Sequence, residues 1–289
     1  MLLNLLLLLA IAALSCLSER SYIENAIQYN PQGELELLKV VQSATDKKGG
    51  SVVGVKFSNA LLIAAARRRA SSLFELSAQD KVMVFDKGRI LVAFSGLLHY
   101  KSDVANAIRS FCAHHALVHS SPVPIYKLCH SLGSTMHSMT TNFERIPMGL
   151  NMLIAGYDQE QDRFLLYSVH PDGSYQEWKA TAIGYNCEKL TSTLSSLMEP
   201  RLVAHPAVEE MWPEFVQQVL LSDLMIDKSK PELHNGPTSS EDDQRKPEGL
   251  AVQYSREKDF EVYCLAKGAA CMEWRQIPWS DILGHVNEP

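Results

Sequence analysis

The stretch from residue 51 to residue 96 constrains the fold most. It contains four short apolar runs, at residues 51–57, 61–65, 82–85 and 90–94. Turn-forming residues separate the runs of each pair, at positions 58–60 and 86–88. Short apolar runs broken in this way are typical of β-hairpins. Nearly every residue in the runs is apolar. The two hairpins are therefore predicted to form a sheet that is covered on both faces.

Composition narrows the functional classes. The chain has 289 residues and a net charge of −6, which argues against a dedicated nucleic-acid-binding protein because such proteins are normally basic. Its six cysteines are scattered and include no CxxC pair, so the sequence predicts no zinc site. We expect most of them to be buried thiols in a reducing compartment.

The first twenty residues form a separate segment. Residues 2–14 are an apolar run that resembles the hydrophobic part of a secretory signal. The run lacks a basic region before it and is too short for a membrane-spanning helix of about 20 residues. Two interpretations stay open: entry into the secretory pathway, or an upstream extension on a cytosolic protein.

The rest of the chain alternates strands with pairs of helices. After a turn at residues 30–33, helices are expected at residues 34–44, 104–118, 125–139, 187–197 and 207–226. Further strands are expected at residues 149–157, 164–169, 174–181, 250–254 and 260–265. Pro213 should lie in the first turn of its helix or mark the true start of that helix. Residues 227–248 are too polar to order themselves and are predicted to be an exposed insertion. This order predicts an α+β fold in which two sheets pack face to face between helix pairs, a four-layer α-β-β-α sandwich. Residues 51–289 would form this single domain, and residues 21–50 would precede it.

Several short motifs resemble those of α-type subunits of the 20S proteasome. They are residues 30–35 (NPQGEL, against Ser-Pro-x-Gly-Arg-Leu in the family), 94–97 (FSGL), 145–149 (RIPMG), 155–158 (AGYD), 171–173 (PDG) and 179–184 (KATAIG). The resemblance covers about residues 22–197 and implies the fold of N-terminal nucleophile hydrolases. It also implies that Tyr22, Pro31, Gly33 and Leu35 belong to a segment at the ring face that gates the channel.

Two departures from the family pattern stand in that segment. Glu34 replaces the family's arginine, and residues 37–40 (LLKV) replace its Gln-Val-Glu-Tyr. Because these residues help α subunits to form a ring, we expect the ring contacts of this chain to be altered.

The resemblance also locates the catalytic positions. In catalytic subunits of the family, a freed N-terminal threonine attacks the peptide carbonyl with its own amine as base, and an aspartate and a lysine tune that amine. These three positions fall on Gly50, Ala66 and Lys81. Glycine and alanine supply no functional group, so a non-catalytic subunit without cofactor or metal is expected. The alternative is a hydrolase that uses Ser51 after cleavage between Gly50 and Ser51; Thr45 is also close in sequence.

Lys81 has a second predicted role. By its position, Lys81 resembles the pocket lysine of α-type subunits that binds the C-terminal carboxylate of regulatory particles. The alternative is a lysine that is solvated or paired within its own subunit. The expected partners are other α-type and β-type subunits and these C-terminal tails, with no nucleic acid and no membrane. The expected location is the cytoplasm and nucleus.

Other candidate sites have simpler interpretations. The basic run at residues 67–69 is interpreted as a solvated strand end. His115 and His119 are one helical turn apart, but the sequence places no third metal ligand beside them. Together with His114, they are interpreted as helix-surface and core-edge residues. Met136 and Met139 are interpreted as core residues. A secreted copy with a new binding role is suggested only by residues 2–14.

Overall fold

The computed structural model describes residues 29–66, 80–142, 146–158, 161–199, 207–216, 218–220, 260–267 and 272–278. Its helices are α2 (Glu36–Lys48), α3 (Lys101–His119), α4 (Ile125–Thr140), α5 (Cys187–Met198) and α6 (Val208–Phe215), with a short 3₁₀ turn, η2 (Leu98–Tyr100). Its strands are β1 (Val52–Lys56), β2 (Ala60–Ala66), β3 (Val82–Phe85), β4 (Ile90–Gly96), β5 (Leu150–Asp158), β6 (Arg163–Val169), β7 (Tyr175–Glu177), β8 (Ala180–Ile183), β9 (Phe260–Lys267) and β10 (Met272–Gln276).

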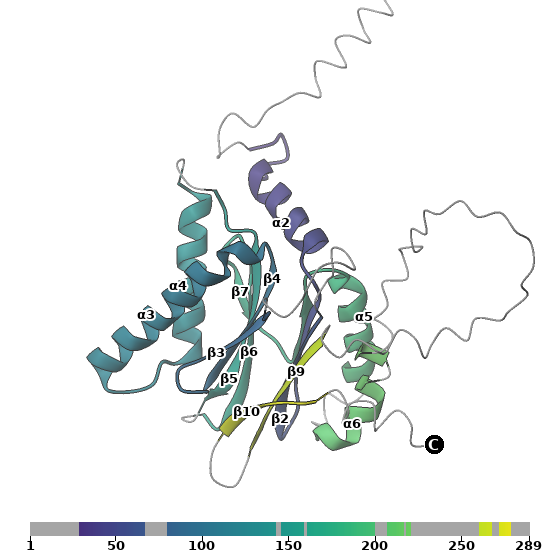
Figure 1. Ribbon diagram of the computed structural model, residues 1–289. Coiled ribbons are helices and arrows are strands. Elements are labelled where there is room, and N and C mark those ends of the chain that lie inside the picture. The colour runs from purple at the N-terminus through teal and green to yellow at the C-terminus, as the bar shows by residue number, and fades with distance from the viewer. Residues whose placement is uncertain are drawn as a thin grey trace, which may run out of the picture.

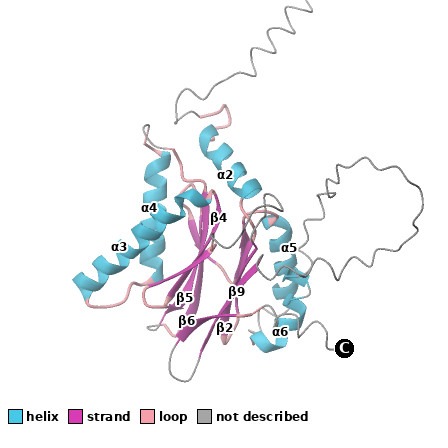
Figure 2. Ribbon diagram, in the orientation of Figure 1, coloured by secondary structure: helices cyan, strands magenta, loops and turns pink. Residues whose placement is uncertain are grey.

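The strands form two five-stranded antiparallel sheets. One has the order β10-β9-β2-β1-β8 and the other the order β3-β4-β5-β6-β7. Helices α3 and α4 lie outside the second sheet, and α5 and α6 lie outside the first (Figures 1 and 2). The predicted four-layer α-β-β-α sandwich is therefore confirmed.

The two hairpins at residues 51–96 do not share a sheet, and on this point the sequence-based prediction is wrong. The β1–β2 hairpin belongs to the first sheet and the β3–β4 hairpin to the second. Both hairpins are so apolar because each sheet is covered by helices on one face and by the other sheet on its opposite face. Every residue of β2 is buried accordingly.

The strand predicted at residues 174–181 is divided between the two sheets. The Trp178 amide donates to Leu166 O at 2.9 Å in the second sheet, whereas Lys179 O accepts from the Lys56 amide at 2.8 Å in the first. The chain thus crosses from β7 to β8 at one peptide unit. Alternation of side chains along the sequence carries no sign of such a crossing, because both halves are extended.

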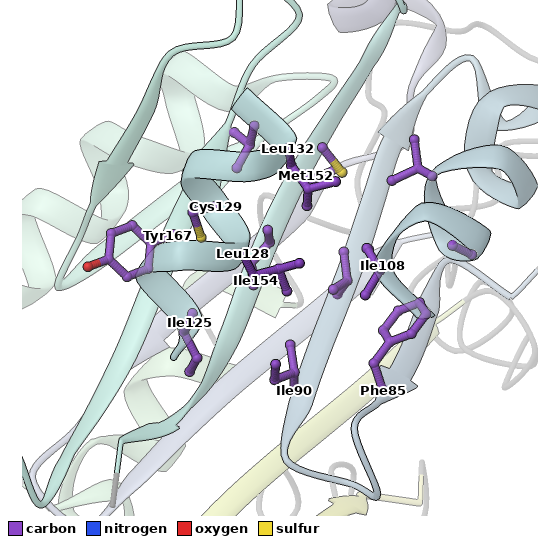
Figure 3. Packing of buried hydrophobic residues seen from close by; sticks show 14 of the residues in the cluster. Phe85, Ile90, Ile108, Ile125, Leu128, Cys129, Leu132, Met152, Ile154 and Tyr167 are labelled. Carbon is purple, nitrogen blue, oxygen red and sulfur yellow. The ribbon is translucent and has the colours of Figure 1, made fainter. Parts of the chain in front are cut away.

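Three apolar layers hold the sandwich together. One lies between the sheets and includes Val52, Leu91 and Leu166. A second joins the first sheet to α5 and α6, and the third joins the second sheet to α3 and α4. Figure 3 shows the third layer, in which Leu128 and Cys129 of α4 face Ile154 and Tyr167.

Helix α6 differs from its prediction at Pro213. The proline lies in the second turn of the helix, not in the first. Residues 216 and 218–220 continue as a wider, π-helical turn, which fits the loss of one backbone donor at the proline. None of the described helices is long and apolar enough to span a membrane.

Several predicted features lie outside the described residues. They are residues 1–20, Tyr22, the basic run 67–69, the insertion 227–248 and the strand predicted at 250–254.

Candidate functional site

Gly50, Ala66 and Lys81 meet at one end of the sandwich. A Cβ built on Gly50 would overlap Lys81 Nζ and Ala66 O, and it would lie 3.1 Å from Lys81 Cε. Lys81 is only 3% exposed. Three positions that are far apart in the sequence are therefore neighbours. The space into which a side chain at position 50 would point is already occupied.

Strand pairing explains this convergence. Antiparallel pairing of β1 with β2 places Ala66 beside Ser51, whose carbonyl accepts from the Ala66 amide at 2.9 Å. Lys81 precedes β3 in the other sheet, where its carbonyl accepts from the Phe94 amide at 2.9 Å. The ends of two different sheets thus supply the two sides of the site.

Ser95 and Gly184 complete the surroundings of Gly50. The Ser95 hydroxyl donates to Gly50 O at 2.7 Å and is buried. Gly184 has φ +85°, and a Cβ there would overlap both Ser95 Oγ and Gly50 O. The sequence motifs FSGL and KATAIG contain these residues, but a motif alone did not reveal that they meet at this backbone.

Ser51 points away from Lys81. Its hydroxyl donates to Tyr185 O at 2.5 Å. Because side chains alternate along a strand, Ser51 shares the face of Val53, which packs toward α5 and α6. Gly50 shares the opposite face with Val52, between the sheets.

The C-terminal end of α2 covers this end of the sandwich (Figure 1). Thr45 is fully buried, and its Oγ1 donates to Val41 O at 2.8 Å within the helix. Asn151 Nδ2 donates to Asp46 Oδ1 at 3.1 Å and so ties α2 to β5. The Gly49 amide donates to Thr45 O at 2.9 Å, which caps the helix directly before Gly50.

Burial dominates the electrostatics beside α2. It raises the pKa of Asp46, against the opposing effect of the bond from Asn151. Burial likewise lowers the pKa of His170, against the opposing effect of the carboxylates of Asp172 and Asp46. Both shifts have the same main cause, the burial of these side chains at the joint between α2 and the sheet.

Comparison with known proteins identifies the family. The family model described as "Proteasome subunit" matches residues 46–222. The chain belongs to the proteasome subunit family. Proteasome subunit alpha type-4-2 of Oryza sativa subsp. indica is 26% identical over 189 residues, which cover 65% of this chain and 75% of that protein. Proteasome subunit alpha type-7-like of Macaca fascicularis is 28% identical over 166 residues, covering 57% of this chain and 65% of that protein. The resemblance drawn from the sequence motifs is confirmed.

In this proteasome subunit, the segment before α2 forms the predicted turn. Asn30 Oδ1 accepts from the amides of Gln32 at 3.1 Å and of Glu34 at 2.8 Å, and Gly33 has φ +82°. Pro31 is exposed, and Leu35 forms an isolated bridge with Tyr29. The helix then begins at Glu36, two residues later than predicted.

The two departures from the family pattern contact each other. Lys39 Nζ lies 2.7 Å from Glu34 Oε2, and this bond is the main reason why the pKa of Glu34 is lowered. The family pattern has arginine and glutamate at these two positions. Compared with that pattern, both charges are reversed in this chain, where they form an ion pair.

A groove follows the outer face of α4. Its volume is about 840 Å³, and its lining includes Phe111, Tyr126, Lys127, His130, Thr135 and Tyr175. The rings of His130 and Tyr175 meet edge to face at 6.1 Å between centroids. The groove combines aromatic side chains, which are enriched at protein interfaces, with hydroxyls and a lysine.

The remaining predicted residues have structural roles. Met136 is buried in the α3–α4 layer, which confirms its prediction as a core residue, whereas Met139 is partly exposed. Cys112 and Cys129 are buried free thiols, whereas Cys187 and Cys264 are partly exposed. Within the described residues, no group of three or more His, Cys, Asp or Glu side chains could hold a metal ion.

Proposed function

We propose that this chain is a non-catalytic α-type subunit of the 20S proteasome core. Its role would be ring assembly, channel gating and docking of regulatory particles in ubiquitin-dependent protein catabolism, in the cytoplasm and nucleus. Its partners would be other α-type and β-type subunits. The filled space at Gly50 carries the proposal, because the position at which catalytic relatives need a hydroxyl has no room for one.

The chain that leads into Gly50 supports the same conclusion. Catalysis in this fold needs a free amine on the nucleophilic residue. Here α2 continues to Lys48, and its capping bond joins Gly49 to Thr45 immediately before Gly50. A free amine at position 50 would require cleavage directly behind a capped and covered helix.

The alternative nucleophile Ser51 has little support from its surroundings. Its hydroxyl is bonded to Tyr185 O, on the face of β1 opposite to Lys81. A serine nucleophile needs a base within hydrogen-bond reach. The nearest partner of this hydroxyl is a carbonyl oxygen, which cannot take its proton.

Two surfaces are proposed for ring contacts. Helix α2 carries partly exposed apolar side chains, and Val40 among them is 57% exposed. The groove beside α4 is the second surface, where Tyr126 is also exposed. Apolar side chains on two separate faces favour a chain with a neighbour on each.

The docking role of Lys81 stays a prediction. The ammonium lies inside the site, so a tail carboxylate would have to enter the space beside Gly50 and Ala66. Lys81→Met keeps most of the apolar stem and removes the charge. If Lys81 binds tails, this variant in an assembled particle should weaken binding of a regulatory-tail peptide, whereas unchanged binding would rule the role out.

Assembly is the decisive test. A tagged full-length chain should co-sediment with a large particle, and mass spectrometry should identify the adjoining chains as α-type and β-type subunits. Val40→Lys should reduce this incorporation, whereas Val84→Lys, at an exposed position of β3, serves as the matched control. A chain that stays monomeric at every concentration, or an isolated chain whose peptidase activity disappears in Ser51→Ala, would refute the proposal.

A further inference from the structure

Two histidines pack against each other in the last turn of α3. His115 and His119 are one helical turn apart, with ring centroids 4.4 Å apart and planes inclined by 47°. His115 is 7% exposed, whereas His119 is exposed. This end of α3 projects away from the sheets (Figure 1), so the pair is accessible from the His119 side.

The surroundings of His115 fix which ring nitrogen carries the proton. His115 Nδ1 lies 3.2 Å from Ser121 O. Because a carbonyl oxygen only accepts, Nδ1 must donate, and in the neutral ring Nε2 then presents a lone pair. Nε2 is buried and has no hydrogen-bond partner. A buried polar atom without a partner requires an explanation, and an absent ion is one.

The bond to Ser121 is also the arrangement that metal-binding histidines use. Such histidines usually donate their second ring N–H to a carbonyl or carboxylate, which orients the ring and its free nitrogen. A histidine pair spaced by four residues on one helix is a recurring pair of metal ligands. His115 satisfies the first condition, and the His115–His119 pair satisfies the second.

We propose that His115 and His119 form a two-ligand site for a divalent transition-metal ion, of the Cu²⁺ and Ni²⁺ class. With nitrogens about 2.1 Å from the ion, ring centroids lie about 4.6 Å apart at an N–metal–N angle of about 90°. A tetrahedral angle would separate them by about 5.3 Å. The observed 4.4 Å is short enough for both rings to reach one ion, and imidazole nitrogens bind Cu²⁺ and Ni²⁺ strongly among the divalent ions.

The neighbouring residues leave the other coordination positions open. Cys112 lies one turn before His115, and burial raises its pKa to about 11; among the described side chains it forms no three-residue metal group with the two histidines. Because no third ligand was found among the described side chains, water or a neighbouring chain would complete the coordination.

The test is a calorimetric titration of the full chain with Ni²⁺ in neutral, chelator-free buffer. Ni²⁺ is chosen because it binds imidazole without oxidising thiols. His119→Gln removes the exposed ligand and should weaken binding by about tenfold or more. His114→Gln, the adjacent exposed histidine, should change affinity by less than about twofold, because successive residues of a helix do not share a face.

A second variant separates the metal site from a merely packed ring pair. His115→Asn can still donate to Ser121 O through its amide but has no group in place of Nε2. If the site exists, it should weaken Ni²⁺ binding as strongly as His119→Gln while circular dichroism stays unchanged. Affinity equal to the parent chain in His119→Gln, or an equal loss in His114→Gln, would overturn the proposal and leave two rings in tilted contact.

Discussion

The closed space at Gly50 can be tested by adding one methyl group. Gly50→Ala places a Cβ where Lys81 Nζ and Ala66 O now lie. The two obstacles differ in kind, because the lysine end can swing away but the carbonyl belongs to a paired strand. Ala66 is held to Ser51 by a 2.9 Å backbone bond, so β2 cannot retreat without loss of that pairing.

The expected effect is that of overpacking. Adding a methylene-sized group to a packed interior lowers the free energy of unfolding by about 1–3 kcal/mol. In a domain of this size, each kcal/mol lowers the melting temperature by about 2–4 °C. Gly50→Ala should therefore melt about 2–12 °C below the parent chain, and Gly50→Thr further below, since it adds two more atoms.

Thermal and urea unfolding of four chains would separate the two obstacles. The set is the parent chain, Gly50→Ala, Lys81→Met and the double variant. If Lys81 Nζ obstructs the methyl group, Lys81→Met should relieve part of the destabilisation, with an interaction energy of at least about 0.5 kcal/mol. The destabilisation that remains in the double variant measures the clash with the Ala66 carbonyl.

Two results would refute this reasoning. A Gly50→Ala chain that melts with the parent would mean that the site has room for a side chain. Peptidase activity in Gly50→Thr would mean that a hydroxyl at this position can still react, and it would remove the main support for a non-catalytic subunit.

Three further predictions concern charge and thiol chemistry. Burial raises the pKa of Asp46, so its ionised form opposes folding at neutral pH. Asp46→Asn keeps an acceptor for Asn151 and should therefore resist urea better than the parent chain at pH 7. This difference in stability should disappear below about pH 4, where Asp46 is protonated in the unfolded chain as well. The raised pKa of Cys112 predicts that thiol reagents label it far more slowly in the native chain than in urea, and fast native labelling would contradict its burial. Glu34→Arg should reduce incorporation into the particle, and Glu34→Arg with Lys39→Glu should restore it; equal incorporation of both variants would show that the pair is irrelevant to assembly.

The layers of the fold were predictable from the sequence, whereas the sheet membership of particular strands was not. Alternating blocks of apolar strands and amphipathic helices allow few arrangements other than a covered pair of sheets. By contrast, the crossing between β7 and β8 depends on the amide of Trp178 and the carbonyl of Lys179 bonding to opposite sheets. No residue type predicts which sheet such a backbone group joins, because the amide or carbonyl of any residue can form either hydrogen bond.

The candidate site was likewise only partly predictable from the sequence. Resemblance to the family located Gly50, Ala66 and Lys81 one by one. It could not show that Lys81 occupies the side-chain position of residue 50, because that depends on how the two sheet ends approach each other. Ser95 and Gly184 were visible only as parts of motifs, since their roles are bonds and close approaches to the Gly50 backbone.

These contacts make the small size of Gly50 part of the present packing, in addition to its role in the proposed absence of catalysis. Removing the side chain lets Lys81 and the Ala66 carbonyl close over the backbone, while α2, capped at Gly49, closes it from the front. A single substitution would therefore restore a hydroxyl without restoring a site: the lysine would have to move, Ala66 would have to become acidic, and the chain would have to be cut after Gly49. Because the three changes involve separate elements, partial reversals should be less stable than the parent chain and still inactive.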